Sequence, residues 1–382
     1  MEKNEILVIY GGRPEEMAYR VAEEAALAEL IGDRAKRIGL KPNLVVARPA
    51  DEGATTHSGI ARGLVRYLQK NGFRNIAIIE GSWAGSRTGE AFPRCGYTAL
   101  ASEFSSGGSR VELIDTQTDT HRSHDCKGMR IEICDSALAV DFMINLPVMK
   151  GHCQTLITCA LKNNKGVIPN SEKRRFHTIG LHKPIAHLNT VVRNDFILAD
   201  GICGDPDFEE GGNPVAANRV FAARDPVLCD AWVAAQMGYA AEDIPYIGFA
   251  EKLGVGSANL GGALVREIAA PKNAASFAAR PTGKARRLAA YIDENNACSA
   301  CYAALVFALS RMGEEELRRL PGRVCVGQGF AGKAGKIGSG NCTAAFGASA
   351  KGCPPSGAAI LGFLRGLRRA GEAPGSALSI ER

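Results

Sequence analysis

The chain has 382 residues, of which 46% are hydrophobic and 23% charged, and its formal net charge is +6. This length exceeds the usual size of one domain, so we expect two domains. Its apolar runs fall well short of the ~18 residues that a membrane-spanning helix needs, and its first residues resemble a strand and not a secretory signal. These features predict a cytoplasmic protein that does not bind a membrane.

Short apolar strands alternate with amphipathic helices from the N-terminus to about residue 270. This alternation predicts an α/β domain in which a mostly parallel sheet carries helices on both faces. Ligands of such sheets bind where strands end and loops leave the sheet. Strands are expected at 6–10, 37–46, 75–81, 110–115, 141–146, 195–201 and 219–225, and the clearest helices at 14–31, 58–73 and 226–238.

The composition changes after residue 270, which predicts a second and smaller α/β domain. We place the first domain at 1–270, an aperiodic linker at 271–285, the second domain at 286–372 and a loose tail at 373–382. At a length of ~90 residues, a metal centre often supplements a thin hydrophobic core.

Twelve cysteines are the most informative part of the composition. Because disulfides rarely persist in a reducing compartment, clustered cysteines there more often bind metal or take part in redox chemistry. The second domain has a C-x2-C-x40-C-x10-C pattern made by Cys298, Cys301, Cys342 and Cys353. Isolated cysteines are expected to be small buried hydrophobes, and these are Cys95, Cys126, Cys134, Cys159, Cys203 and Cys229, with Cys325 on a strand. The reactivity of Cys153 stays open.

Four thiolates suit either zinc or an iron–sulfur cluster. Zinc ribbons usually supply two close pairs of ligands, whereas Cys342 and Cys353 are widely split, and a proline follows Cys353 as it follows cluster cysteines of ferredoxins. The "GCPP" segment and the C-x2-C start resemble the cluster-binding part of nickel–iron hydrogenase small subunits and of the terminal-cluster subunit of respiratory complex I. This resemblance implies one 4Fe–4S cluster, without hydrogenase activity. Zinc and unligated thiols are the alternatives.

Residues 150–187 form a basic segment with seven Lys or Arg residues, one acidic residue and four of the seven histidines. Concentrated positive charge attracts anions. Because Phe176 is the one aromatic residue there, the segment favours a small anionic molecule over nucleic acid. The run containing Lys173, Arg174 and Arg175 is expected to be a solvated loop.

Polar residues at strand ends and helix starts are the candidates for a site in the first domain. Lys150 and His152 follow an apolar strand, and His57 precedes a helix whose N-terminus would hold a ligand. An imidazole near lysines can exchange a proton near neutral pH. We therefore predict catalytic roles for His57, His152 and Lys150. The predicted substrate contacts are Lys41, Asn43, Thr56, Lys162, Asn163, Lys165, His177, His187 and Asp200.

The acidic stretch "GICGDPDFEEGGNP" follows one of the predicted strands. Its carboxylates do not have the spacing of a calcium-binding EF-hand loop. We expect a glycine-rich surface loop, which could act as a lid over the basic segment. Neither a dinucleotide G-x-G-x-x-G fingerprint nor a Walker A motif occurs in the sequence.

Several stretches, among them "KPNLV", "TTHSGIARGL", "FMINLPVMKGH", "ITCALKNNKGVIP" and "RDPVLCDAWVAAQMG", resemble the domain of unknown function 362 family, in order over about residues 36 to 255. Members of this family are often described as iron–sulfur proteins. The chain lacks the typical ferredoxin insert with two C-x2-C-x2-C-x3-C-P runs, and its C-terminal domain stands in that place. The resemblance implies little about the reaction.

The sequence favours an iron–sulfur oxidoreductase that reduces a small anion. Lys150, Lys162 and Lys165 would hold the anion, while His57 or His152 transfers a proton and the cluster supplies electrons. One alternative is an electron-transfer protein that docks an acidic redox partner through the basic segment. The other is a redox-neutral lyase or isomerase, which would need an iron without a protein ligand and therefore fits four cysteines poorly.

Overall fold

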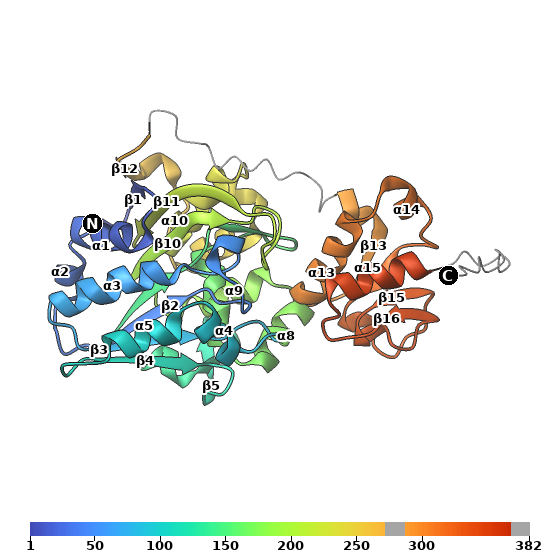
Figure 1. The fold of residues 1–382 in the computed structure, drawn as a ribbon, viewed down its shortest axis with the longest axis horizontal. Helices are drawn as coiled ribbons and strands as arrows, with labels where there is room; N and C mark the ends of the chain where they lie inside the picture. The colour runs from blue at the N-terminus through green and yellow to red at the C-terminus, as the bar shows by residue number, and fades with distance from the viewer. Residues whose placement is uncertain (272–286, 368–382) are drawn as a thin grey trace, which may run out of the picture. The chain divides into compact units, whose positions relative to one another are not determined.

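The computed structural model describes residues 1–271 and 287–367, and the chain divides into two compact units, Met1–Thr282 and Gly283–Arg382 (Figure 1). Nearly all of the expected linker at 271–285 and the whole expected tail at 373–382 lie outside the described residues. Each unit has its own sheet and its own helices, and each is described by itself below.

An eight-stranded sheet forms the centre of the first unit, with the order β12-β1-β11-β10-β7-β2-β3-β4. Strand β11 runs antiparallel to both of its neighbours, and the other pairings of this sheet are parallel. The predicted α/β class with a mostly parallel sheet is therefore confirmed. The strands are β1 Glu5–Tyr10, β2 Ile38–Pro42, β3 Asn75–Glu80, β4 Arg110–Asp115, β7 Phe142–Leu146, β10 Phe196–Gly204, β11 Val215–Ala223 and β12 Leu264–Ile268.

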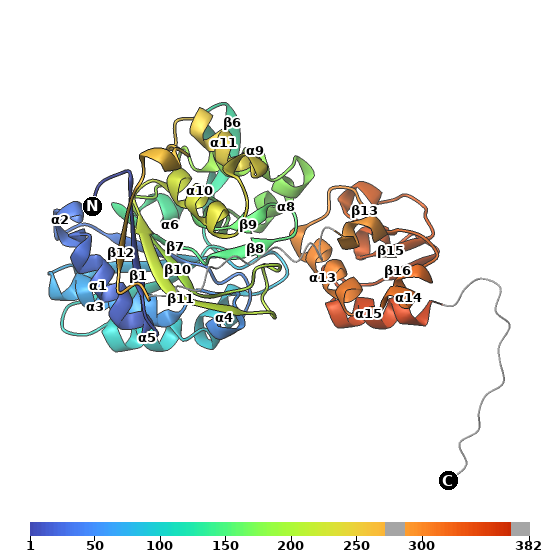
Figure 2. The ribbon, with the colours of Figure 1, turned by 90° about the horizontal axis from the view of Figure 1, so that it is seen from above.

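Helices cover both faces of this sheet (Figure 2). Side chains of a strand alternate between the two faces, so Leu7 and Ile9 pack with one layer of helices while Ile6 and Val8 pack with the other. The first layer contains α1 Pro14–Glu24, α2 Leu27–Ile31, α3 Ser58–Lys70, α4 Thr88–Arg94 and α5 Tyr97–Phe104. The second contains α6 Asp135–Leu138, α7 Ala160–Asn163, α8 Asn170–Thr178, α9 His182–Leu188, α10 Pro226–Gln236 and α11 Pro245–Lys252.

Three features of the first unit differ from the sequence-based expectation. The helix expected at 14–31 is divided into α1 and α2, because Ala26 adopts a positive φ of 51°. Two antiparallel hairpins were not predicted, β5 His121–Cys126 with β6 Met129–Cys134, and β8 Lys150–His152 with β9 Leu156–Thr158. The second hairpin begins at Lys150, so the basic segment starts as a strand.

The second unit is built on a small parallel sheet with the order β13-β14-β15-β16. Its strands are β13 Ile292–Glu294, β14 Val324–Val326, β15 Ile337–Ser339 and β16 Ala348–Ala350, and its helices are α13 Ser299–Ser310, α14 Glu314–Arg318 and α15 Gly357–Gly366. Among the described residues of both units, no helix has the length and apolarity needed to cross a bilayer.

Candidate functional site

The candidate site of the first unit lies where parallel strands end. Lys41 of β2 and Asn145 of β7 are partners in the sheet register, and Glu80 is the last residue of β3. Asp200 of β10 forms a bridge with Val148, two residues after the end of β7. Parallel strands bring their carboxyl ends to one edge of the sheet, so the order of the strands gathers these polar side chains.

Lys41 and Glu80 form a buried ion pair at this edge. The Nζ of Lys41 lies 2.9 Å from Glu80 Oε2, and the two side chains are 1% and 3% exposed. Backbone N–H groups of Leu44 and Gly81 also donate to the Glu80 carboxylate. Burial lowers the pKa of Lys41, while the charge of Glu80 opposes that shift. Removal of either side chain would therefore leave its partner buried without an ion-pair partner.

Asn163, on the short helix α7, links this ion pair to the neighbouring strand. Its Nδ2 donates to Asn145 Oδ1 at 2.7 Å and to the Lys41 carbonyl at 3.1 Å. Its Oδ1 accepts from Asn43 Nδ2 at 3.0 Å. A Cβ at Gly166 would lie 2.1 Å from Glu80 Oε1, so only glycine allows the segment after α7 to approach the pair.

Glu209 occupies the position in which a ligand anion was expected. Its carboxylate pairs with Lys162 Nζ and, at 3.1 Å, with His152 Nε2, while its backbone carbonyl accepts from Lys150 Nζ at 2.8 Å. Burial opposes ionisation of Glu209, but the charges of Lys162 and Lys150 and the hydrogen bond from His152 hold the pKa of Glu209 well below its usual value. Lys150 and Lys162 are therefore already paired with groups of the chain itself.

The loop that carries Glu209 is docked and does not project as a surface lid. Asp205 is buried, and its carboxylate accepts backbone N–H bonds from Asp207, Phe208 and Asn213. A Cβ at Gly151 would lie 2.0 Å from the Pro206 carbonyl oxygen, which shows how closely the loop meets hairpin β8–β9. The expectation of a surface loop is corrected. The loop is docked because the buried Lys162 needs the carboxylate of Glu209 as its partner.

His152 is held in one neutral form by its neighbours. Its Nδ1 accepts backbone N–H bonds from Gln154 and Thr155, both at 3.0 Å, which leaves the proton on the Nε2 that faces Glu209. Burial and the charge of Lys162 lower the pKa of His152 to about 4. The expected proton exchange near neutral pH does not fit this geometry.

His57 and Asp200 have the geometry of an acid–base pair. His57 Nδ1 lies 2.8 Å from Asp200 Oδ2, which also accepts the backbone N–H of His57. Asp200 is fully buried, whereas the His57 side chain is 19% exposed. Burial alone would lower the pKa of His57, but the hydrogen bond and charge of Asp200 raise it above its usual value. Asp200 fixes the ring so that Nε2 is the nitrogen directed to exchange a proton.

The other predicted contacts divide into two groups. Thr56 Oγ1 donates to the Leu146 carbonyl and accepts from Asn43 N, and Lys165 Nζ lies 3.4 Å from His177 Nε2. These residues belong to the same region. His187 does not, because its Nδ1 bonds to the Cys126 carbonyl of hairpin β5–β6.

Lys173 corrects another expectation. It was expected in a solvated loop, but it is buried on α8, and its Nζ donates to the carbonyls of Gly81 and Ser82. Burial lowers its pKa to about 8, although the charge of Glu80 opposes the shift. Sequence reasoning also missed Glu80 and Glu209 as residues of the site. Glu80 lies at the end of a predicted strand, and that position could have identified it.

In the second unit, the four patterned cysteines follow the ends of the small parallel sheet. Cys298 lies after β13 and caps α13, Cys301 lies in the first turn of α13, and Cys342 and Cys353 follow β15 and β16. Burial, and then the charges of Cys298, Cys353 and Cys342, raise the pKa of the Cys301 thiol to about 12. The thiol of Cys301 is thus within electrostatic reach of the other three.

Backbone bonds bring the last two of these cysteines together. Asn341 N donates to the Gly352 carbonyl at 2.8 Å, and Gly352 N donates to Asn341 Oδ1 at 2.9 Å. Because Asn341 precedes Cys342 and Gly352 precedes Cys353, the two loops are tied side by side. A Cβ at Gly340 would lie 3.6 Å from Cys301 Sγ, so the backbone of Gly340 lies close to the Cys301 thiol.

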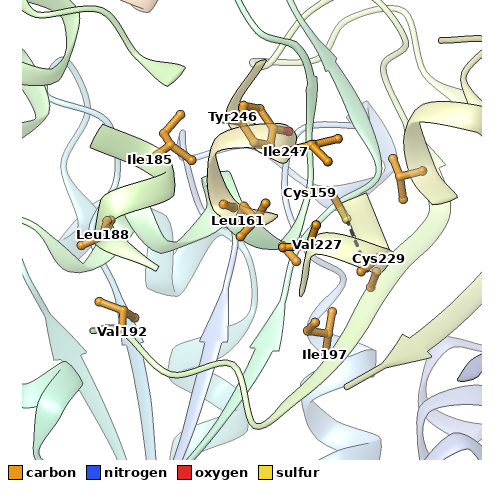
Figure 3. Packing of buried hydrophobic residues seen from close by; sticks show 14 of the residues in the cluster. Cys159, Leu161, Ile185, Leu188, Val192, Ile197, Val227, Cys229, Tyr246 and Ile247 are labelled. Carbon is orange, nitrogen blue, oxygen red and sulfur yellow. Dashed lines mark hydrogen bonds between the residues drawn. The ribbon is translucent and has the colours of Figure 1, made fainter. Parts of the chain in front are cut away.

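A separate group of polar atoms lies in the apolar core of the first unit (Figure 3). Cys159 Sγ and Cys229 Sγ are 4.0 Å apart, and a carboxylate oxygen of Asp230 lies within 4.8 Å of both. These distances would permit a metal ion. However, each oxygen of Asp230 accepts a backbone N–H bond, from Ala160 at 2.7 Å and from Leu161 at 3.2 Å. The group therefore has a structural role, in which Asp230 of α10 caps α7.

Residues 38–235 match the protein family described as Domain of unknown function (DUF362). The matched segment is more than half of the 382-residue chain. The chain belongs to the DUF362 family. This finding agrees with the resemblance seen in the sequence motifs. No curated protein matches the chain significantly.

Among solved structures, the chain is similar to the lactate racemase apoprotein from Thermoanaerobacterium thermosaccharolyticum. The sequence identity is 13%, the TM-score is 0.37, and the similarity covers 57% of this chain and 54% of the racemase chain. The match thus spans about half of each chain.

The DUF362 segment contains the candidate site of the first unit but not the four patterned cysteines. Lys41, Glu80, Lys162, Asp200 and Glu209 all fall within residues 38–235. Cys298 and the cysteines that follow it lie beyond the end of the match. The chain therefore adds its cysteine-rich unit to the DUF362 fold.

Proposed function

We propose that Cys298, Cys301, Cys342 and Cys353 bind a 4Fe–4S cluster, and that the protein is an oxidoreductase acting on a small anionic substrate. The observation that carries this proposal is the position of the four cysteines after strands of one small sheet, with the loops of Cys342 and Cys353 tied together by the hydrogen bonds between Asn341 and Gly352. When bound, the cluster would supply single electrons.

The donor set fits a cluster better than a single zinc ion. Four zinc-bound sulfurs at bonds of ~2.3 Å would lie within about 4 Å of one another. Among the described residues, Cys159, Cys229 and Asp230 have ligand atoms that all lie within 4.8 Å of one another. The four patterned thiols do not form such a group. A four-iron cluster holds its ligand sulfurs further apart, because each sulfur binds a different iron.

In the first unit, His57 would hold and transfer the proton that a reduction requires. Asp200 accepts from Nδ1, which leaves Nε2 as the ring nitrogen for proton transfer, and the His57 side chain is 19% exposed. A raised pKa lets His57 carry a proton at neutral pH more often than an ordinary histidine does. Of the two histidines predicted to transfer a proton, His57 is therefore the candidate acid.

A concentration of lysines favours an anionic substrate. Five lysines surround the site, and the carboxylates that act on Lys150 and Lys173 are Glu80, Glu209, Glu210 and Asp115. Burial raises the pKa of Glu210 to about 7, so its charge is only partly present at neutral pH. The lysines are Lys41, Lys150, Lys162, Lys165 and Lys173. A cluster of lysines attracts a carboxylate or phosphate.

Anaerobic purification followed by iron and sulfide analysis tests this proposal. We expect about four irons and four sulfides per chain, with an EPR signal after reduction. Cys342→Ala should lose most of the iron, whereas Cys325→Ala, which removes a thiol on β14 outside the proposed ligand set, should retain it. Stoichiometric zinc without an EPR signal would refute the cluster.

A redox-neutral lyase or isomerase is the second candidate, because the His57–Asp200 pair can move a proton without any electrons. Turnover of small carboxylates and phosphate compounds with and without reductant separates the two functions. The oxidoreductase requires a reductant, while the lyase or isomerase turns over equally in its absence.

A further inference from the structure

The side chain of Gln328 makes a direct contact with one of the patterned cysteines. Its Nε2 donates a hydrogen bond to Cys298 Sγ over 3.6 Å. Gln328 begins the short 3-10 helix η6, Gln328–Phe330, two residues after the end of β14. Sulfur accepts hydrogen bonds weakly as a thiol and more strongly as a thiolate or a cluster ligand, because its negative charge attracts the N–H dipole.

The backbone around Gln328 fixes this contact. Gln328 N donates to the Asn296 carbonyl at 3.0 Å, and Gly329 N donates to the Asn295 carbonyl at 2.9 Å. Gly327 has a φ of 125°, and a Cβ there would lie 2.1 Å from the Asn295 carbonyl oxygen. Since residues 295–297 lead directly into Cys298, the amide and the thiol are held by the same pair of neighbouring strands.

We propose that the Gln328 amide sets the reduction potential of the cluster through its N–H bond to Cys298. This inference rests on the proposed cluster. Reduction adds one electron to the cluster, and the added negative charge spreads onto the ligand sulfurs. A fixed N–H donor stabilises that charge, so it favours the reduced form over the oxidised form and raises the potential.

Two substitutions test the role of Gln328 in the full-length protein. Gln328→Leu removes the donor at a similar size, and Gln328→Glu keeps the shape but brings a carboxylate to the sulfur. We expect potentials in the order wild type, then Leu, then Glu, from highest to lowest. For Gln328→Leu, a tenfold less favourable reduction corresponds to a shift of ~59 mV for a one-electron couple.

The measurement is an EPR-monitored redox titration with dithionite as the electron donor, made on samples of known iron content. Cys325→Ser is the matched control, because Cys325 lies on β14 three residues before Gln328 and bonds to Asp293 instead. Its potential should equal that of the wild type.

The outcomes separate this inference from the proposed function. If Gln328→Leu and Gln328→Glu keep four irons but titrate with the wild-type potential, the role of Gln328 is refuted and the cluster stands. Loss of iron in both variants would also refute it, since Gln328 would then retain the cluster and not tune it. A wild-type protein without iron and sulfide would overturn both proposals.

Discussion

At the scale of single residues, the orientation of His57 depends on one buried carboxylate. Asp200 accepts from both the ring Nδ1 and the backbone N–H of His57, and it is fully buried. A buried charge has a large effect on a neighbouring imidazole because little water screens it. The pKa of His57 is therefore a direct measure of this contact.

We predict that Asp200→Asn lowers the pKa of His57, because the substitution removes the negative charge and leaves burial, which favours the neutral ring. An NMR titration of the His57 imidazole measures the change. Asp51→Asn, which removes a charge with a weaker effect on His57, should lower the pKa less. An unchanged His57 titration in Asp200→Asn would contradict the pairing.

The same pair predicts a dependence of stability on pH. The folded pKa of His57 lies above its unfolded value, ~6.5 for an ordinary histidine. The stabilisation is therefore complete below that value and is lost as the pH rises through the folded pKa. Denaturant unfolding at a series of pH values should show this loss in the wild type and a smaller loss in Asp200→Asn.

Gly166 permits a close approach in the site, so its substitution should be costly. A Cβ there would meet Glu80 Oε1 at 2.1 Å and Lys41 Nζ at 2.6 Å. We expect Gly166→Ala to destabilise the first unit by about 1–3 kcal/mol, as overpacking does in other cores. Gly89→Ala on α4 is the matched control, because nothing lies within 4 Å of its Cβ. Equal unfolding midpoints for the two variants would contradict this account.

At the scale of elements, Asp230 connects helix α10 to helix α7. Its carboxylate accepts the backbone N–H groups of Ala160 and Leu161, and the next two residues of α7 are Lys162 and Asn163 of the site. A helix of four residues cannot hold its position by its own hydrogen bonds. The cap from α10 therefore positions two side chains of the site from within the apolar core.

Asp230 also predicts how stability depends on pH. Burial raises its pKa to about 7, against the opposing effect of the two N–H bonds. Because the folded pKa exceeds the unfolded value near 4, the folded state loses stability as the pH rises from about 4 to 7. Asp230→Asn should reduce this loss of unfolding free energy between pH 4 and 7 by an amount on the order of a few kcal/mol. If the free energy of unfolding depends on pH equally in the wild type and the variant, Asp230 is ionised in the folded state.

The elements that the sequence predicts well are those with local signals. Alternating patterns located the strands and helices around the sheet, and the strand-end rule brought Lys41, Asn43 and Asp200 into one region. Glu209 was not predicted as a site residue, because its partners Lys162 and His152 lie about 50 residues earlier in the chain. No local pattern encodes such a pairing, since it depends on where a loop returns.

The same limit explains the error at Lys173. A run of basic residues usually marks a solvated surface, and composition alone gives no other indication. Helix α8 instead places one face of the run against the carbonyls of Gly81 and Ser82. Burial of a lysine is decided by the acceptors that the tertiary fold brings to it, and these lie 90 residues away in the sequence.

At the scale of the whole molecule, the chain divides into two compact units, and each has its own sheet and its own buried hydrophobic side chains. Units of this kind unfold as independent cooperative blocks unless a large interface couples them. All four proposed ligands belong to the second unit, and the His57–Asp200 pair belongs to the first. Removal of the proposed cluster should therefore affect the transition of the second unit.

We predict two transitions in anaerobic calorimetry of the iron-loaded protein. Because a group that binds only the folded state stabilises it, chelation of the iron or Cys342→Ala should lower the transition of the second unit, whose sheet has strands of three residues. Gly166→Ala should instead lower the transition of the first unit, and it provides the reciprocal control. A single transition that both changes shift equally would show that the units unfold together, and the assignment of separate cores to separate functions would then be wrong.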